Sequence, residues 1–119
     1  MPRESYQLPL KNRPSWVEYP HSYCRVVSQM LVDLRPWHIM DSTEIARRFE
    51  GLSKRYPTRD LLPFAYRQDN DDLACWAKGE GERVFIVHDY ASPGWESEGE
   101  FHDVWAWFRA AVEETIAWE

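Results

Sequence analysis

Clustered acidic residues are the first feature of this sequence that could do chemistry, because carboxylate oxygens are the ligands of hard cations. The densest cluster is the run Asp-Asn-Asp-Asp at residues 69–72. Read as a calcium-binding EF-hand loop, it places Leu73 where an oxygen ligand is needed and Ala74 where a glycine is needed. We therefore expect a solvated β-turn here and no metal site.

A cysteine and a histidine could form a nucleophile and base pair, which requires the two side chains to lie within hydrogen-bond reach. Cys75 and His88 lie on segments that we expect to be neighbouring strands. However, Cys75 alternates with Leu73 and Ala77, which is typical of a buried face. Asp89 follows His88 directly, and adjacent strand residues point to opposite faces, so we expect Asp89 to bond loop backbone instead. An enzyme using His88, Asp89 and Cys75 is the less favoured alternative to a protein with no catalytic residues.

The glycines and cysteines give no sign of a cofactor. In the segment 79–82 two glycines alternate with two glutamates, and glutamates repel phosphate. Cys24 and Cys75 lack a CxxC partner or a histidine at metal-ligand spacing, so both read as reduced core residues. We expect no cofactor and no metal.

Acidic and aromatic residues near the C-terminus form the remaining candidate site, one that would bind a protein. Residues 89–119 contain one basic and eight acidic residues, whereas residues 1–88 contain 13 basic and 12 acidic ones. Such a surface repels nucleic acid and attracts basic proteins, with a basic toxin domain as one candidate. We expect the partner to contact Trp95, Glu96, Glu98, Glu100 and Asp103, with Asp69, Asp71 and Asp72 as a second acidic contact.

Two tryptophans are displaced from the main apolar stripe of the C-terminal segment. Trp107 and Trp118 are eleven residues apart, close to three helical turns, which places both on one side of a helix. They form either a second interface, which includes self-association, or a broadened apolar face covered by the same protein. The oligomeric state stays open.

Length and composition indicate one globular domain. The chain has 119 residues, of which 44% are hydrophobic, enough for a core without disulfides or a metal. It has no apolar run that could cross a membrane, and its first residues lack the apolar stretch of a signal peptide, so we expect a cytoplasmic protein that does not bind membranes. Prolines at positions 2, 9 and 14 predict an extended lead-in over residues 1–18, before a single domain over residues 19–119.

Hydrophobic patterning predicts an α+β fold, in which two N-terminal helices and a C-terminal helix pack on an antiparallel or mixed sheet. The predicted helices cover residues 20–33, 42–55 and 101–117. The second has a capping box, Asp-Ser-Thr-Glu at residues 41–44. Alternating runs predict a central meander of three strands over about 61–89. We expect a short strand or an extended link over residues 37–40, and a polar loop over residues 90–99.

Several local strings resemble the SUKH superfamily, which includes fungal cell-wall assembly regulators and many bacterial toxin-immunity proteins. The resemblance spans residues 19–118 and is carried by Tyr19-Pro20-His21-Ser22-Tyr23, Leu61-Leu-Pro-Phe-Ala65, Leu73-Ala-Cys-Trp76, Val84 to Asp89 and Phe101 to Phe108. Members often have an Asn-Gly turn after the first helix, where this chain has Asp33-Leu-Arg-Pro36.

The resemblance implies helices packed on a mixed sheet and a role as a binding module, without catalytic residues. The expected function is therefore that of a non-enzymatic cytoplasmic binding module, an immunity protein that neutralises a polymorphic toxin, such as a nuclease, by protein–protein binding through its acidic and aromatic face. A regulatory or scaffold protein without a toxin partner is the alternative.

Overall fold

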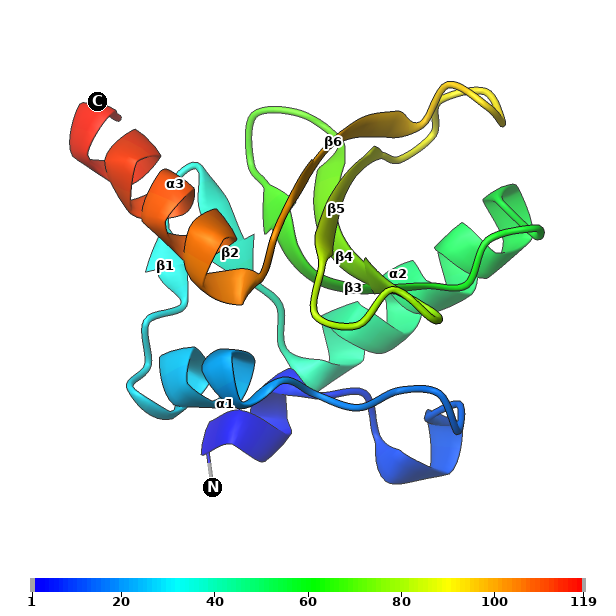
Figure 1. Cartoon of the computed structure of the whole chain (residues 1–119), viewed down its shortest axis with the longest axis horizontal. Coiled ribbons are helices and arrows are strands. Elements are labelled where there is room, and N and C mark those ends of the chain that lie inside the picture. Colours follow the sequence, from blue (N-terminus) through cyan, green and yellow to red (C-terminus); the bar gives the residue numbers. More distant parts are fainter. Residues whose placement is uncertain (1, 119) are drawn as a thin grey trace.

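One antiparallel sheet organises the fold, with its six strands in the order β1-β2-β3-β4-β5-β6 (Figure 1). The computed structural model describes residues 2–118 and the side chains of residues 4–118. The strands are β1 (Asp33–Leu34), β2 (Trp37–Ile39), β3 (Leu61–Arg67), β4 (Asp72–Ala77), β5 (Val84–His88) and β6 (Ser97–Phe101). The helices are the 3₁₀ helices η1 (Pro2–Tyr6) and η2 (Leu10–Asn12) and the α-helices α1 (His21–Ser28), α2 (Ser42–Arg55) and α3 (Val104–Ala117). The predicted α+β class is confirmed.

Because neighbouring strands run in opposite directions, the sheet has two ends that carry different connections. The β3–β4 turn and the β5–β6 loop, residues 89–96, lie at one end, which we call the loop end. The β4–β5 turn, residues 78–83, lies at the opposite end, which we call the turn end. In Figure 1 the β5–β6 loop projects at the upper right, away from the helices α1 and α3.

The two faces of the sheet bury different side chains. Trp76 of β4 packs against Tyr23 of α1 and stacks on Phe64, which contacts Trp107 of α3 edge-on. On the other face, Cys75 joins a smaller cluster with residues of α2 and β5. Successive residues of β4 thus point to opposite layers, as strand geometry requires.

The first helix is shorter than its periodicity predicts. It ends at Ser28 instead of residue 33, because Met30 takes a left-handed backbone conformation with φ of 58°. The amide of Leu31 then donates to the carbonyl of Val26, and that of Met30 to Val27, which is the hydrogen-bond pattern of a Schellman cap. The following residues form the β1–β2 hairpin with a cis bond before Pro36, so the expected short strand over residues 37–40 is present as β2.

The second helix forms over the predicted residues, and the third starts later than predicted. Asp41 caps α2 by accepting a hydrogen bond from the Glu44 amide at 2.9 Å. Asp103 caps α3 in the same way, from the Ala106 amide at 2.9 Å, so the helix begins at Val104 and not at residue 101. The last residues of the predicted loop, 97–99, are instead the start of strand β6. This strand lies at the exposed edge of the sheet, and its polar sequence lacks the apolar alternation that would predict a strand.

The lead-in is not extended. Residues 2–12 contain both 3₁₀ helices, and Leu8 is buried in the core with 1% exposure. The Leu8 amide donates to the Tyr19 hydroxyl at 2.8 Å, and the Tyr23 hydroxyl donates to the Tyr6 carbonyl at 2.5 Å. Part of this segment therefore packs on α1 as a short helical turn, and Leu8 belongs to the same core as the sheet.

Candidate functional site

The β5–β6 loop presents a tryptophan to solvent at the loop end of the sheet. Trp95 is 79% exposed, and Tyr90 in the same loop is 58% exposed. Tryptophan is highly buried on average and is a frequent anchor of protein interfaces, so a loop that presents an indole this exposed is a candidate contact surface. Two buried carboxylates fix the two ends of this loop.

The start of the loop is anchored by Asp89, whose side chain is completely buried. Nε and Nη2 of Arg55 donate to its two carboxylate oxygens, each at 2.6 Å, and Nη1 of Arg48 lies 3.6 Å away. The Asp89 carboxylate raises the pKa of Arg55, mainly through this hydrogen bonding. Burying a carboxylate costs several kcal/mol unless it is paired, so the start of the loop is fixed to the C-terminal half of α2.

Tyr90, the next residue, has a left-handed backbone conformation with φ of 69°. Such a conformation costs a bulky side chain about 1–3 kcal/mol. Two contacts offset this cost. The Tyr90 amide donates to Asp89 Oδ1 at 2.9 Å, and the Arg55 guanidinium lies 4.1 Å from the Tyr90 ring centroid.

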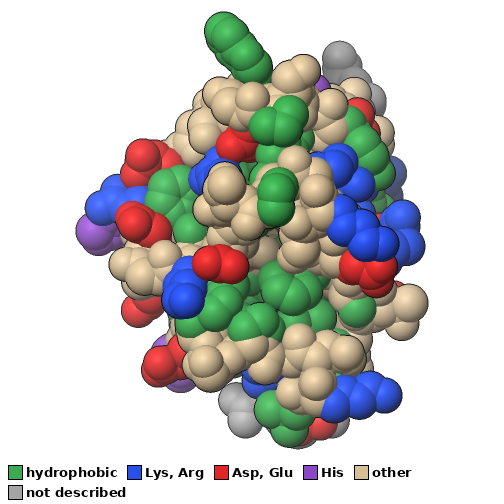
Figure 2. Space-filling model, turned by 90° about the vertical axis from the view of Figure 1, so that its right-hand side faces the viewer, with side chains coloured by type: hydrophobic (Ala, Val, Ile, Leu, Met, Phe, Trp, Pro, Cys, Tyr) green, Lys and Arg blue, Asp and Glu red, His purple; other side chains and the backbone are tan. Residues whose placement is uncertain are grey.

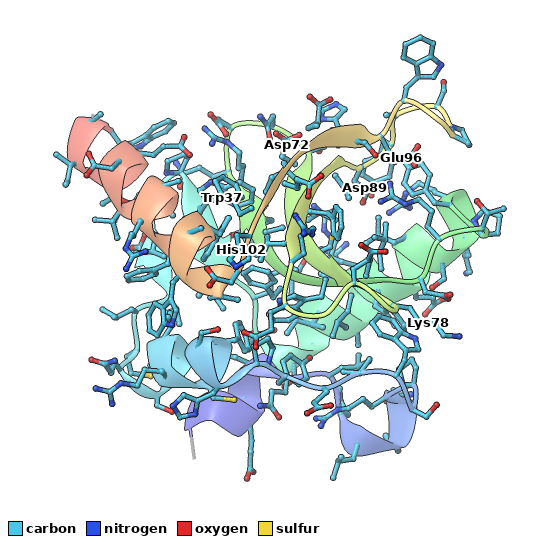
Figure 3. The ribbon with its side chains drawn as sticks, viewed as in Figure 1. Trp37, Asp72, Lys78, Asp89, Glu96 and His102 are labelled. Carbon is cyan, nitrogen blue, oxygen red and sulfur yellow. The ribbon has the colours of Figure 1, made fainter. Side chains whose placement is uncertain are left out.

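The end of the loop is anchored by Glu96, which is 6% exposed. Its carboxylate accepts from Arg59 Nη1 at 2.9 Å and from the Gly94 amide at 2.7 Å. Burial alone raises the pKa of the Glu96 carboxyl, but hydrogen bonds from its own amide, from Arg59 and from Gly94 outweigh burial and lower it. The Tyr56 hydroxyl also donates to the Ala91 carbonyl at 2.7 Å. The loop is thus held at both ends by residues at or just after the C-terminus of α2. Figure 3 labels the two carboxylate residues that they hold, Asp89 and Glu96.

The structure brings most of the predicted contact residues to the loop end and separates two from it. Trp95, Glu96, Glu98, Asp69, Asp71 and Asp72 lie in or beside the β3–β4 turn and the β5–β6 loop. Glu100 lies further along β6, where it pairs with Arg83 at 2.8 Å, and Asp103 caps α3. A single continuous acidic face over all eight residues is therefore not formed.

Most of these carboxylates already have partners inside the protein. Asp69 pairs with Arg67 at 2.9 Å, and Asp72 bonds Nδ1 of His88 at 2.8 Å. Among the residues that the structure describes, the side chains of Asp71 and Glu98 have no such partner. The pKa of His88 is raised mainly by its hydrogen bond with Asp72. The negative charges of Asp72, Glu98 and Asp71 raise this pKa further.

Two predicted contact residues are corrected because they are buried. Glu96 faces Arg59 inside the protein, so it shapes the loop and does not present a charge to a partner. Trp107 is 1% exposed, with its ring 5.0 Å from Phe64 and 5.7 Å from Trp37. It belongs to the core, whereas Trp118 is 38% exposed near the end of the chain.

The simplest enzymatic arrangement is not assembled. Cys75 is fully buried and pairs across the sheet with Phe85, whereas His88 lies opposite Asp72 on the other face. Burial strongly raises the pKa of the Cys75 thiol, which disfavours the thiolate form that a nucleophile needs. Asp89 is held by Arg55 and does not orient His88.

Sequence reasoning missed the arginines that hold the loop. Arg48, Arg55 and Arg59 come from the helix and its following turn, more than thirty residues before their acidic partners. A cluster of basic residues at the C-terminal end of the predicted second helix was the available signal. Among the described residues, no group of three potential ligands could hold a metal ion, and no helix is long and apolar enough to span a membrane.

No protein-family model matches the chain, and no curated protein or solved structure shows significant similarity to it.

Proposed function

We propose that this protein is a non-catalytic binding module whose β5–β6 loop docks onto a protein partner through Trp95. The observation that carries the proposal is the contrast between the exposed Trp95 and the buried ion pairs on either side of it. Tryptophan is a common anchor of protein interfaces, and a loop that is already ordered loses little conformational entropy on binding. The buried ion pairs keep the loop ordered before the partner arrives.

We further propose that binding neutralises a toxin in the cytoplasm, as in the immunity proteins of the SUKH superfamily that the sequence resembles. Asp71 and Glu98 support a basic partner such as a nuclease domain, because both are exposed carboxylates without an ion-pair partner among the described residues. They would raise the association rate, and salt would screen the effect. The free thiols of Cys24 and Cys75 support a reducing compartment.

Photo-crosslinking in cells from position 92, an exposed position of the same loop that leaves Trp95 intact, would identify the partner, and the purified partner would then be titrated calorimetrically. We expect Trp95→Ala to weaken binding at least tenfold, which corresponds to about 1.4 kcal/mol. The matched control is Ile116→Ala, which removes a side chain 73% exposed on α3, away from the loop. Equal affinities of the wild type and Trp95→Ala would contradict the docking proposal.

The toxin part of the proposal has a separate test. The identified partner would be expressed alone in a bacterial host and then together with either the wild-type protein or Trp95→Ala. We expect growth inhibition by the partner alone, rescue by the wild type and loss of rescue with the variant. A partner that binds through Trp95 but does not inhibit growth would point to the regulatory or scaffold alternative.

A further inference from the structure

A recess lies away from the β5–β6 loop, beside the turn end of the sheet. One wall is formed by residues 16–21, which precede and begin α1, and the other by Ala77, Gly79, Gly81 and Glu82 around the β4–β5 turn. Leu62 and Trp76 form the floor. Its volume is about 350 Å³, near the lower limit for ligand pockets. We call it the aromatic groove. Figure 2 views the side of the molecule that carries residues 10–16, where hydrophobic side chains gather in the lower half.

The aromatic side chains of the groove are fixed before any ligand binds. The Tyr19 ring lies 5.5 Å from Trp76, edge-on, and 5.4 Å from Tyr23, stacked. Its hydroxyl accepts a hydrogen bond from the Leu8 amide at 2.8 Å. Trp16 is half-buried beside them in the same wall. These rings form an ordered surface, so a ligand would not have to organise it.

The charges of the groove are acidic. Glu18 lies on one wall and Glu82 on the other, both are exposed, and neither has an ion-pair partner among the described residues. None of the described lining residues is a lysine or an arginine, and His21 is the one histidine among them. Arg13, outside the lining, places its guanidinium 5.2 Å from the Tyr19 ring centroid. The groove therefore repels phosphates and carboxylates, and it attracts a cation.

The open turn on one wall leaves room for an incoming chain. Gly79 and Gly81 have φ of 79° and 60°, which favours glycine at both positions. A Cβ atom added at either glycine would contact nothing within 4 Å. The wall is therefore low on this side, and an extended segment could pass over it.

From these observations we infer that the aromatic groove binds an arginine side chain presented by an extended segment of a partner protein. Tyr19 already stacks on Tyr23 and carries Arg13, and Trp76 is only 4% exposed, so the ring left for an incoming guanidinium is the half-buried Trp16. A guanidinium can stack on this indole and also bond the carboxylates of Glu18 and Glu82, which a neutral side chain cannot do. Lysine fits less well, because its ammonium is more strongly hydrated and cannot stack as a plane. The site is separate from Trp95, so its failure would leave the proposed function of the loop intact.

The test uses N-acetyl-arginine amide as the probe and follows the indole N–H signals of the protein by NMR. The Trp16 signal is identified as the one missing from Trp16→Phe. We expect a saturable shift of this signal with the arginine probe and none with N-acetyl-citrulline amide, which has nearly the same shape but no charge. Trp95→Ala should bind the probe like the wild type.

Two glutamates of the same turn supply matched variants. Glu82→Gln removes a carboxylate of the groove and should weaken probe binding about fivefold. Glu80→Gln removes a carboxylate two residues away, outside the groove, and should leave binding unchanged. Equal weakening by both variants, equal shifts with citrulline, or no shift of Trp16 would each overturn the inference.

Discussion

The two ends of the sheet use the same residue types in opposite ways. At the loop end, the carboxylates of Asp89 and Glu96 are buried against arginines while the indole of Trp95 is exposed. At the turn end, the rings of the aromatic groove are recessed while the carboxylates of Glu18 and Glu82 are exposed and unpaired among the described residues. Buried carboxylates thus hold the loop end together, beside the exposed Asp71 and Glu98, whereas both carboxylates of the groove are exposed.

This difference shows that net charge alone does not locate a binding surface. Residues 89–119 carry the whole net negative charge of the sequence, yet part of that charge neutralises arginines inside the protein. The carboxylates of the groove belong to the nearly neutral first 88 residues. Substitutions of buried carboxylates or of their partners should lower the free energy of unfolding, whereas substitutions of exposed carboxylates should leave it almost unchanged.

Removing the main partner of Asp89 should have the largest effect. Arg55→Met would leave the buried Asp89 carboxylate without its two 2.6 Å hydrogen bonds and with Arg48 as its nearest cation. We expect the free energy of unfolding to fall by about 3–5 kcal/mol, because an unpaired buried charge is costly. Urea unfolding followed by circular dichroism measures the change.

A double-mutant cycle supplies the control for this prediction. Asp89→Asn keeps the shape of the side chain but removes its charge, so Arg55→Met should cost less in that background than in the wild type. If the two substitutions are additive, then Asp89 and Arg55 do not act as a pair. Asp89 would then not be a buried anchor of the β5–β6 loop. The contrast between buried carboxylates at the loop end and exposed ones at the turn end would not hold for this residue.

Glu96→Gln should have the next largest effect. The amide keeps the shape of the side chain but loses the charge that faces Arg59. We expect a loss of about 1–3 kcal/mol in the free energy of unfolding, the range for a buried hydrogen bond to a charged group. Glu98→Gln is the matched control on the adjacent strand and should change stability by less than about 0.5 kcal/mol. Equal losses would mean that burial does not distinguish the two glutamates.

The fold was largely predictable because its strongest signals are local. The Asp41 capping box placed α2 correctly, and the alternating runs identified β3, β4 and β5. The predicted boundaries are wrong where the hydrophobic pattern of the sequence does not match the observed backbone conformation. Met30 and Leu31 continue the apolar period of α1, but the left-handed conformation of Met30 ends the helix. Polar strand β6 gives almost no periodic signal, since its exposed edge buries little.

The candidate site was predictable only in part. Trp95 follows from an aromatic residue in a polar loop, and the structure leaves it exposed. The roles of Glu96 and Trp107 depend on long-range contacts with Arg59 and Phe64, which sequence spacing does not show. Whether a carboxylate faces solvent or an arginine is decided by the packing of α2 against the β5–β6 loop, so it could not be determined from composition.

His88 gives a smaller, pH-dependent effect at the loop end. Its pKa is raised in the folded protein, chiefly by the Asp72 hydrogen bond, so the pair stabilises the fold fully below the unfolded pKa of 6.5. This contribution is lost as the pH rises through the folded pKa. We expect the stability difference between wild type and His88→Gln to be greater at about pH 5.5 than at about pH 8.5, and to stay below about 1 kcal/mol. In the background Asp72→Asn, the pH dependence of this difference should largely disappear.

The smallest effect on stability is expected at the turn end. The variant with both Glu18→Gln and Glu82→Gln removes two exposed carboxylates from opposite walls of the groove. Since neither has an ion-pair partner among the described residues, the free energy of unfolding should change by no more than about 0.5 kcal/mol. Urea unfolding measures this change for the double variant and for Glu96→Gln under the same conditions. The loss of two exposed charges is then compared directly with the loss of one buried charge. A loss from the double variant as large as that from Glu96→Gln would mean that the groove carboxylates are structural too, and the contrast between the two ends would disappear.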